Sequence, residues 1–319
     1  MDNLSNTRQW TQPLNFTVEF ASTADRVYAN GLQQVQLRVG LAVADENGDL
    51  INISDDDIRS LVLIQHSDAR ELPNADPLMG LPPAAVQWDW SNKRDSRYRF
   101  FPSADPLPEA DNSALASLNS LYRDFWVRSK ASGPLRVAAK VTMRDGTEFF
   151  STEMPSGSVT LVPEAVPVRR ISDYTLRPTN ISERGVSYDY IPFVIRNRGV
   201  LMEFVQFSMT PASISKHSKT AKPGTVHAVF TGYTPTPGKG PISYSQTNSG
   251  LPSTVLQDFI RPGQVVILVA DSTFNLSQSP VPGPNASAGI TAIDRYGNTH
   301  RVTITFNSND DRLRQIKLV

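Results

Sequence analysis

The sequence predicts a mostly β protein made of two β-sandwich domains. Three observations support this prediction. Apolar and polar residues alternate in many short segments, 24 prolines and 18 glycines separate those segments, and runs of Ala, Leu, Glu and Lys typical of helical proteins are scarce. The chain has 319 residues, which is enough for more than one domain with its own core. We therefore expect many short strands joined by turns.

The clearest strand covers residues 35–43. Its odd-numbered positions are all apolar, from Val35 to Val43, while the even-numbered positions are mostly polar or small: Gln34, Gln36, Arg38, Gly40 and Ala42. Alternation of this kind predicts one face in a core and one face in water. The strand ends at Asp45–Asp49, where an Asn-Gly pair tolerates a positive φ, so a hairpin should follow.

The segments around this strand define the first domain. Residues 1–13 are polar and are expected to form an N-terminal arm. The first sandwich domain then covers residues 14–164, opening with an alternating strand at 14–20 and closing with a strand at 158–162. Within it, Asp145-Gly146 predicts a second hairpin.

One short amphipathic helix is also expected in this domain, at residues 113–125. Leu115, Leu118, Tyr122 and Phe125 are spaced by three and four residues, which places them on one face of a helix. Asp111 or Asn112 would cap its N-terminus.

A stiff linker is predicted at residues 163–167, because two prolines in five residues favour extended backbone. The second sandwich domain is therefore assigned to residues 165–319. Its apolar segment 265–270 is expected to be a central strand buried on both faces. Further strands are expected at 191–195, 200–207, 225–230, 289–294 and 300–306.

Two segments of the chain echo each other. Residues 43–48 and 292–298 both place an Asp-led, Gly-containing turn between alternating strands. Two domains of related plan would produce this echo, and so would independent use of common turn chemistry. The sequence leaves both explanations open.

Residues 29–50 resemble bacterial immunoglobulin-like domains of the invasin and intimin kind. The segment opens at Asn30-Gly31, continues as the alternating strand and ends in the Asp45–Gly48 hairpin, in the order found in those domains. The resemblance implies an immunoglobulin-like sandwich used as a spacer or adhesive module, on a cell surface or on phage tails and fibres. The chain departs from the family in its long first domain and its expected helix.

Composition excludes several classes of function. The 31 Lys and Arg residues balance 31 Asp and Glu residues, so no global field attracts nucleic acid or an anionic membrane. The absence of cysteine excludes disulfides, thiolate nucleophiles and cysteine-based zinc sites. We expect no cofactor and no nucleic-acid partner.

The sequence predicts a soluble protein whose compartment stays open between a virion, signal-independent export and the cytoplasm. The longest apolar run, residues 265–270, is far shorter than the roughly 20 residues that cross a bilayer. The first residues lack a basic stretch followed by an apolar one, so no secretory signal peptide is expected.

Three groups of residues are candidates for a site. Asp45, Asn47 and Asp49 alternate as oxygen ligands for calcium would, although a hairpin turn uses the same residues and the terminal Glu of a calcium loop is missing. Trp88 and Trp90, with Tyr98 nearby, would form a stacking platform for a sugar or partner, or else part of a core, which we favour.

The third group is basic. Lys93, Arg94, Arg97 and Arg99 interleave with the aromatic residues, but Asp89 and Asp95 dilute them, which favours a solvated face over a phosphate site. Lys239, together with the lysines of residues 216–222, gives the loops of the second domain a positive bias. That bias would serve a contact surface or solubility alone.

We expect a non-enzymatic structural or interaction protein. The four histidines (His66, His217, His227 and His300) are scattered, and no Gly-x-Ser-x-Gly motif is present. The expected partners are other protein subunits, a host surface, a glycan or a second copy of the chain, in a phage tail fibre, an injection particle or a surface adhesin. The alternatives are a β-rich toxin, with residues 231–254 as a refolding arm at a host membrane, and a carbohydrate-binding module.

Overall fold

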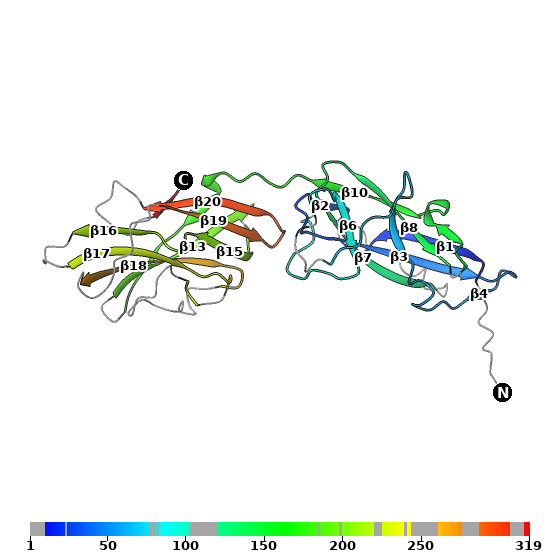
Figure 1. Ribbon diagram of the computed structural model, residues 1–319, viewed down its shortest axis with the longest axis horizontal. Coiled ribbons are helices and arrows are strands. Elements are labelled where there is room, and N and C mark those ends of the chain that lie inside the picture. The colour runs from blue at the N-terminus through cyan, green and yellow to red at the C-terminus, as the bar shows by residue number, and fades with distance from the viewer. Residues whose placement is uncertain are drawn as a thin grey trace, which may run out of the picture. The chain divides into compact units, whose positions relative to one another are not determined.

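The computed structural model describes residues 10–22, 24–76, 81, 83–102, 120–143, 145–183, 186–197, 200–219, 225–238, 241–243, 261–275, 287–306 and 316–319. The chain divides into two compact units, Met1–Val166 (unit 1) and Pro167–Val319 (unit 2), coloured blue to green and green to red in Figure 1. The described residues form strands, turns and two short 3-10 helices, Ser151–Glu153 and Ile171–Asp173. The mostly β class is confirmed.

Unit 1 contains two sheets. The β3 sheet has the order β1 (Gln12–Phe20), β3 (Val35–Ala44), β7 (Leu121–Ser129), β6 (Trp88–Ser91), with β4 (Leu50–Ile51) also paired to β3. The β8 sheet has the order β2 (Arg26–Tyr28), β10 (Ser158–Glu164), β8 (Leu135–Thr142), β5 (Val62–Gln65), with β9 (Glu148–Phe150) on β8. If β1, β3, β5, β6, β7, β8 and β10 are lettered A to G in chain order, the first sheet has the order A-B-E-D and the second contains C-F-G, as in an immunoglobulin-like sandwich.

Unit 2 is built on the same plan. The β18 sheet has the order β11 (Tyr174–Leu176), β13 (Val186–Asn197), β18 (Val265–Asn275), β17 (Thr225–Tyr233), β16 (Ser215–Lys219), and β12 (Thr179–Glu183) and β14 (Val200–Leu201) pair with β13. The second sheet has the order β15 (Phe204–Thr210), β19 (Ser287–Asp294), β20 (Thr299–Phe306), β21 (Ile316–Leu318). The strands β11-β13-β18-β17 and β15-β19-β20 again follow A-B-E-D and C-F-G.

Alternation along each strand explains where the cores lie. In β3, Val35, Leu37 and Val39 are buried, and they belong to one hydrophobic cluster with Phe16 and Phe125 of the flanking strands. In unit 2 the predicted central segment 265–270 lies in β18 between β13 and β17, and all six residues are buried. Each unit therefore encloses its own core between two sheets.

The predicted helix at 113–125 is wrong in the part that the structure describes. Residues 113–119 lie outside the described residues, but Leu121–Ser129 is strand β7, paired with β3. Phe125 and Val127 alternate with Asp124 and Trp126, and the first two are buried in the core. The apolar residues from Leu115 to Phe125 are spaced by three and four, which indicated a helix and hid the alternation of a strand. Pairing with β3 makes the described part of this segment a strand.

The predicted N-terminal arm is shorter than residues 1–13. Gln12 and Pro13 already belong to β1, and Trp10 is buried with its ring centroid 5.3 Å from that of Phe149. Residues 1–9 lie outside the described residues. A large apolar ring near the N-terminus is therefore part of the core of unit 1.

The two echoing turns share their chemistry but not their place in the plan. Asp45 Oδ1 accepts the backbone N–H groups of residues 47 and 49 at 2.9 and 3.0 Å, and Asp294 Oδ1 accepts those of residues 296 and 298 at 2.8 and 2.9 Å. Gly48 and Gly297 take φ values of 83° and 80°, which favour glycine. The first turn joins β3 to β4, whereas the second joins β19 to β20. This favours independent use of one turn chemistry.

We predict that Leu37→Asp unfolds unit 1. Leu37 is fully buried and is paired in register with Phe20 and Phe125, so the carboxylate would lie among apolar side chains without a partner. The expected loss of about 4 kcal/mol or more is comparable with the whole stability of a small domain. Thermal unfolding followed by near-UV circular dichroism measures it. Val168→Asp, at a residue that is 94% exposed, is the control and should leave the transition unchanged; a folded Leu37→Asp protein would contradict the core assignment.

Candidate functional site

The predicted tryptophan platform lies inside unit 1. Trp88 and Trp90 are only 8% and 6% exposed, and the ring of Trp90 packs edge-on against Phe125 at a centroid distance of 4.9 Å. The indole N–H of Trp90 donates to the carbonyl of Leu72 at 2.9 Å. Tyr98 is also buried. Of the two interpretations, the structure favours the core over the stacking platform: alternation in β6 turns both tryptophans towards the core, where their buried area stabilises the sandwich.

The predicted calcium ligands are engaged in a turn. One carboxylate oxygen of Asp45 accepts two backbone N–H groups, and Asp45 itself is buried. Among the described residues, no group of three or more His, Asp or Glu side chains could hold a metal ion. Turn chemistry accounts for the spacing of Asp45, Asn47 and Asp49, and the calcium site stays a prediction.

The structure describes the surroundings of His300 in detail. His300 is buried in unit 2, with Nε2 3.1 Å from Asp294 Oδ2 and Nδ1 3.2 Å from the hydroxyl of Tyr174. Tyr174 and Asp294 are buried as well, so this network ties β11 to the β19–β20 hairpin. The side chains of His217, His227 and Lys239 lie outside the described residues. A fully buried polar network favours a packing role.

The candidate site is a basic loop, residues 92–101, which buried hydrogen bonds hold in place. It follows β6, the edge strand of the β3 sheet. Its exposed residues are Asn92, Lys93, Arg94, Ser96, Arg97 and Arg99, and its buried residues are Asp95 and Tyr98. The loop thus alternates charged side chains in solvent with two inward anchors.

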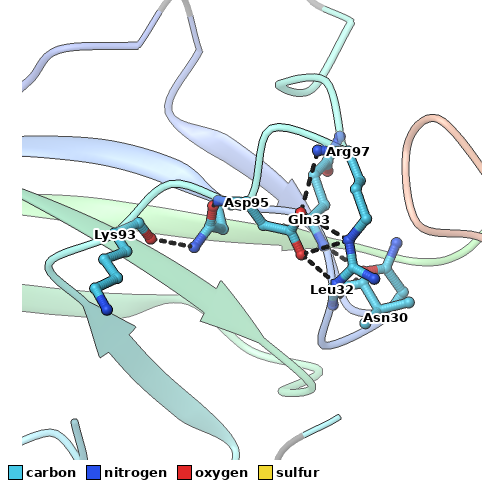
Figure 2. A network of polar contacts seen from close by, with 7 residues as sticks. Asn30, Leu32, Gln33, Lys93, Asp95 and Arg97 are labelled. Carbon is cyan, nitrogen blue, oxygen red and sulfur yellow. Dashed lines mark hydrogen bonds and ion pairs between the residues drawn. The ribbon is translucent and has the colours of Figure 1, made fainter. Parts of the chain in front are cut away.

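Two glutamines hold the backbone of the basic loop. The dashed line at the carbonyl of Lys93 in Figure 2 marks one of these contacts. The buried amide of Gln34 donates to the carbonyl of Lys93 at 3.2 Å and accepts the N–H of Asp95 at 2.6 Å. The equally buried Gln33 donates to the carbonyl of Arg99 at 3.1 Å and accepts the N–H of Tyr28 at 2.7 Å. Each amide uses both its donor and its acceptor, as buried polar groups normally do.

Asp95 also fixes the basic loop, through hydrogen bonds within the loop itself. Its carboxylate accepts hydrogen bonds from Arg97 Nε and Nη2, at 2.9 and 2.7 Å, and from the backbone N–H of Arg97 at 3.1 Å. The hydrogen bond to Asp95 raises the pKa of Arg97 above its ordinary value, so the guanidinium stays charged. The loop is therefore fixed by buried side chains while its basic groups face solvent.

The acids that dilute the basic residues in the sequence do not do so on the surface. Asp89 is buried in β6 and accepts a bidentate pair of hydrogen bonds from Arg128 of β7, both at 2.8 Å. Asp95 is 4% exposed and bound to Arg97. The basic residues are exposed, in agreement with the predicted solvated face. The premise that Asp89 and Asp95 dilute their charge on the surface is wrong, because both carboxylates lie beneath that surface.

Sequence reasoning missed the two glutamines. Gln34 precedes β3 on its polar face, which the alternation assigned to solvent, yet it is 4% exposed because the basic loop covers it. A pair of adjacent glutamines directly before a long apolar strand is the signal that was available. Its partners are about 60 residues further along the chain, and no local pattern identifies them.

A polar row crosses the same face of the β3 sheet beside the loop. Glu19 of β1 is paired in register with Arg38 of β3, which is paired with Asp124 of β7. Arg38 Nε donates to Asp124 Oδ1 at 2.9 Å, and Gln36 Nε2 donates to Asp124 Oδ2 at 3.0 Å. Burial raises the pKa of Glu19 above its ordinary value, Arg38 lowers it by less, and Asp124 adds to the rise.

This shift predicts a pH-dependent effect of Glu19→Gln. With a raised pKa in the folded state, ionisation of Glu19 costs more in the folded protein, so its unfavourable contribution develops as the pH rises above the unfolded pKa. Near pH 7 the variant should therefore melt about 1–2 °C higher than the wild type. Near pH 3, where Glu19 is protonated in both states, the difference should disappear. A variant that melts lower than the wild type near pH 7 would show that attraction to Arg38 dominates.

Comparisons with known proteins add little to this geometry. No protein-family model matches the chain, and no curated protein matches it. Solved structures that are similar to the chain at a low level include two streptococcal proteins. The sialic acid binding region of a Streptococcus sanguinis SK1 adhesin, bound to 3'sLn, has 10% identity and a TM-score of 0.22, covering 97% of this chain and 77% of its own.

The second is the C-terminal domain of the Streptococcus pyogenes antigen I/II-family protein AspA, with 9% identity and a TM-score of 0.23, covering 91% of this chain and 98% of its own. Likenesses of this size carry no argument about the site. In the described part of the chain, no helix is long and apolar enough to cross a membrane.

Proposed function

We propose that this chain is a non-enzymatic β-sandwich module for adhesion or assembly, and that it contacts its partner through the basic loop of unit 1. The observation that carries the proposal is the contrast within the loop. Gln33, Gln34 and Asp95 fix it from below by buried hydrogen bonds, while Lys93 and Arg94 are exposed above them.

Such a loop suits binding for an energetic reason. Ordering a flexible loop on contact costs free energy, and a loop that is already ordered avoids most of that cost. The two sheets supply a stable support, and binding residues concentrate on loops that a rigid scaffold holds in place. The sheets thus provide spacing and the loop provides recognition.

The two alternative functions receive less support. A carbohydrate-binding module that stacks sugars on Trp88 and Trp90 does not fit, because both rings are buried. For the toxin alternative, the start of the expected refolding arm is fixed: Thr231 and Thr234 accept the backbone N–H groups of Ile214 and Val266 at 2.8 and 3.1 Å. Most of the remaining segment, 244–254, lies outside the described residues.

We predict that Lys93→Ser/Arg94→Ser removes binding and leaves the fold intact. Both side chains are exposed, so the melting temperature should change by less than about 2 °C. Fluorescently labelled wild-type protein, added to a panel of bacterial and animal cells and measured by flow cytometry, should bind at least one of them. The double variant should bind about tenfold less, since charge-assisted contacts are lost.

Arg301→Ser/Lys317→Ser is the matched control. It removes two exposed positive charges from unit 2 and should bind as the wild type does. Equal loss in both variants would mean that net charge, and not the basic loop, governs binding. Wild-type protein that binds no cell and forms no oligomer in sedimentation would contradict the proposed function.

A further inference from the structure

The charge of the basic loop is uncompensated at its outer edge. The carboxylates of Asp89 and Asp95 are both buried and both held by arginines. Lys93 and Arg94 form no ion pair with any other described residue. A surplus of positive charge therefore stands at this loop on a protein whose formal net charge is zero, so attraction of anions to the loop is a local effect that salt screens.

Aromatic rings orient two of the guanidinium groups. Arg94 lies over the ring of Phe100, with its central carbon 4.6 Å from the ring centroid, and Arg97 lies 5.4 Å from the centroid of Tyr98. A guanidinium held over a ring by a cation–π contact loses conformational freedom while its N–H donors stay available to an anion. Asp95 occupies two of the donor groups of Arg97, so Arg94 is the residue that offers a fork to an oxyanion.

The loop lacks what other polyanions need. Binding of single-stranded nucleic acid uses exposed rings for base stacking, but Tyr98 is buried and Phe100 is half-buried beneath Arg94. Adsorption to a membrane surface is strengthened where apolar side chains enter the lipid beside the basic ones, whereas the exposed positions here are Asn, Lys, Arg and Ser. A hydrophilic chain with spaced anionic groups fits the loop better than either of these.

We infer that the basic loop binds an acidic polysaccharide through its sulfate or carboxylate groups. This inference rests on the proposed function and names its ligand class. Arg94 binds one oxyanion with its oriented fork, Lys93 binds a neighbouring one as a point charge, and the fixed backbone of the loop keeps the two groups at a constant spacing.

Calorimetric titration of the full chain tests the inference with two probes, a heparin dodecasaccharide for sulfate and a polygalacturonate oligomer for carboxylate. In about 50 mM NaCl at least one probe should bind, and binding should weaken severalfold in about 200 mM NaCl, because exposed charge pairs are screened. Lys93→Ser/Arg94→Ser should bind at least about tenfold more weakly, and Arg301→Ser/Lys317→Ser as well as the wild type.

The variant Arg94→Lys tests whether the paired N–H donors of the guanidinium matter in addition to its positive charge. It keeps the positive charge but loses the planar donors stacked on Phe100, so its affinity should fall about three- to fivefold. Unchanged affinity in Arg94→Lys would overturn the assigned role of the fork. Should the double Ser variant be unstable, Lys93→Gln/Arg94→Gln replaces it, with longer side chains covering the same loop.

Two results would overturn the ligand class. One is the absence of binding to both polysaccharides. The other is tighter, loop-dependent binding to a DNA duplex, to anionic phospholipid vesicles or to poly-glutamate, each measured with the same variants. If cells still bind in a loop-dependent way in either case, the ligand class is wrong and the proposed function stands. If cell binding and oligomer formation in sedimentation are also absent, both are wrong.

Discussion

Pairing of buried polar groups on one face of the β3 sheet is the constraint on which the candidate site depends. Gln34, Arg128 and Asp89 alternate with core residues and so point away from the core, yet all three are buried. A buried charge or amide without a partner costs several kcal/mol, and removing one member of a buried ion pair costs about 3–5 kcal/mol. Arg128 satisfies Asp89 within the sheet, and the backbone of the basic loop satisfies Gln34. The buried Gln34 of the sheet needs hydrogen-bond partners, and the loop backbone supplies them, so the same hydrogen bonds hold the loop on the sheet.

This constraint joins stability to function. The contacts that pair the buried amide of Gln34 are the same contacts that present Lys93 and Arg94 to solvent in a fixed arrangement. Unit 2 shares the strand plan of unit 1, but its buried Asp294, His300 and Tyr174 pair with one another and not with a loop. One plan thus supports two different uses of buried polar side chains, an anchored loop in the first unit and a closed network in the second.

The fold could be predicted largely from the sequence, because a period of two in polarity is a local signal. This signal identified β3, the central strand β18 and the turns at Asp45 and Asp145. The segment of β7 matches helical spacing and strand spacing equally well, and only its pairing with β3 decides between the two. The site could be predicted only as a set of residues. That Lys93–Arg99 is basic is visible in the sequence, but the burial of Asp89 and Asp95, which decides its surface charge, depends on partners distant in the chain.

The most direct test of this account is hydrogen exchange at the backbone N–H of Asp95, which Gln34 accepts at 2.6 Å. If the basic loop is anchored as described, this amide exchanges at a rate comparable with the amides of β3, and Gln34→Ala speeds its exchange by about a hundredfold or more while β3 keeps its protection. Exchange of the wild-type Asp95 amide at the rate of an unfolded peptide would contradict the anchored loop, and with it the basis of the proposed binding surface.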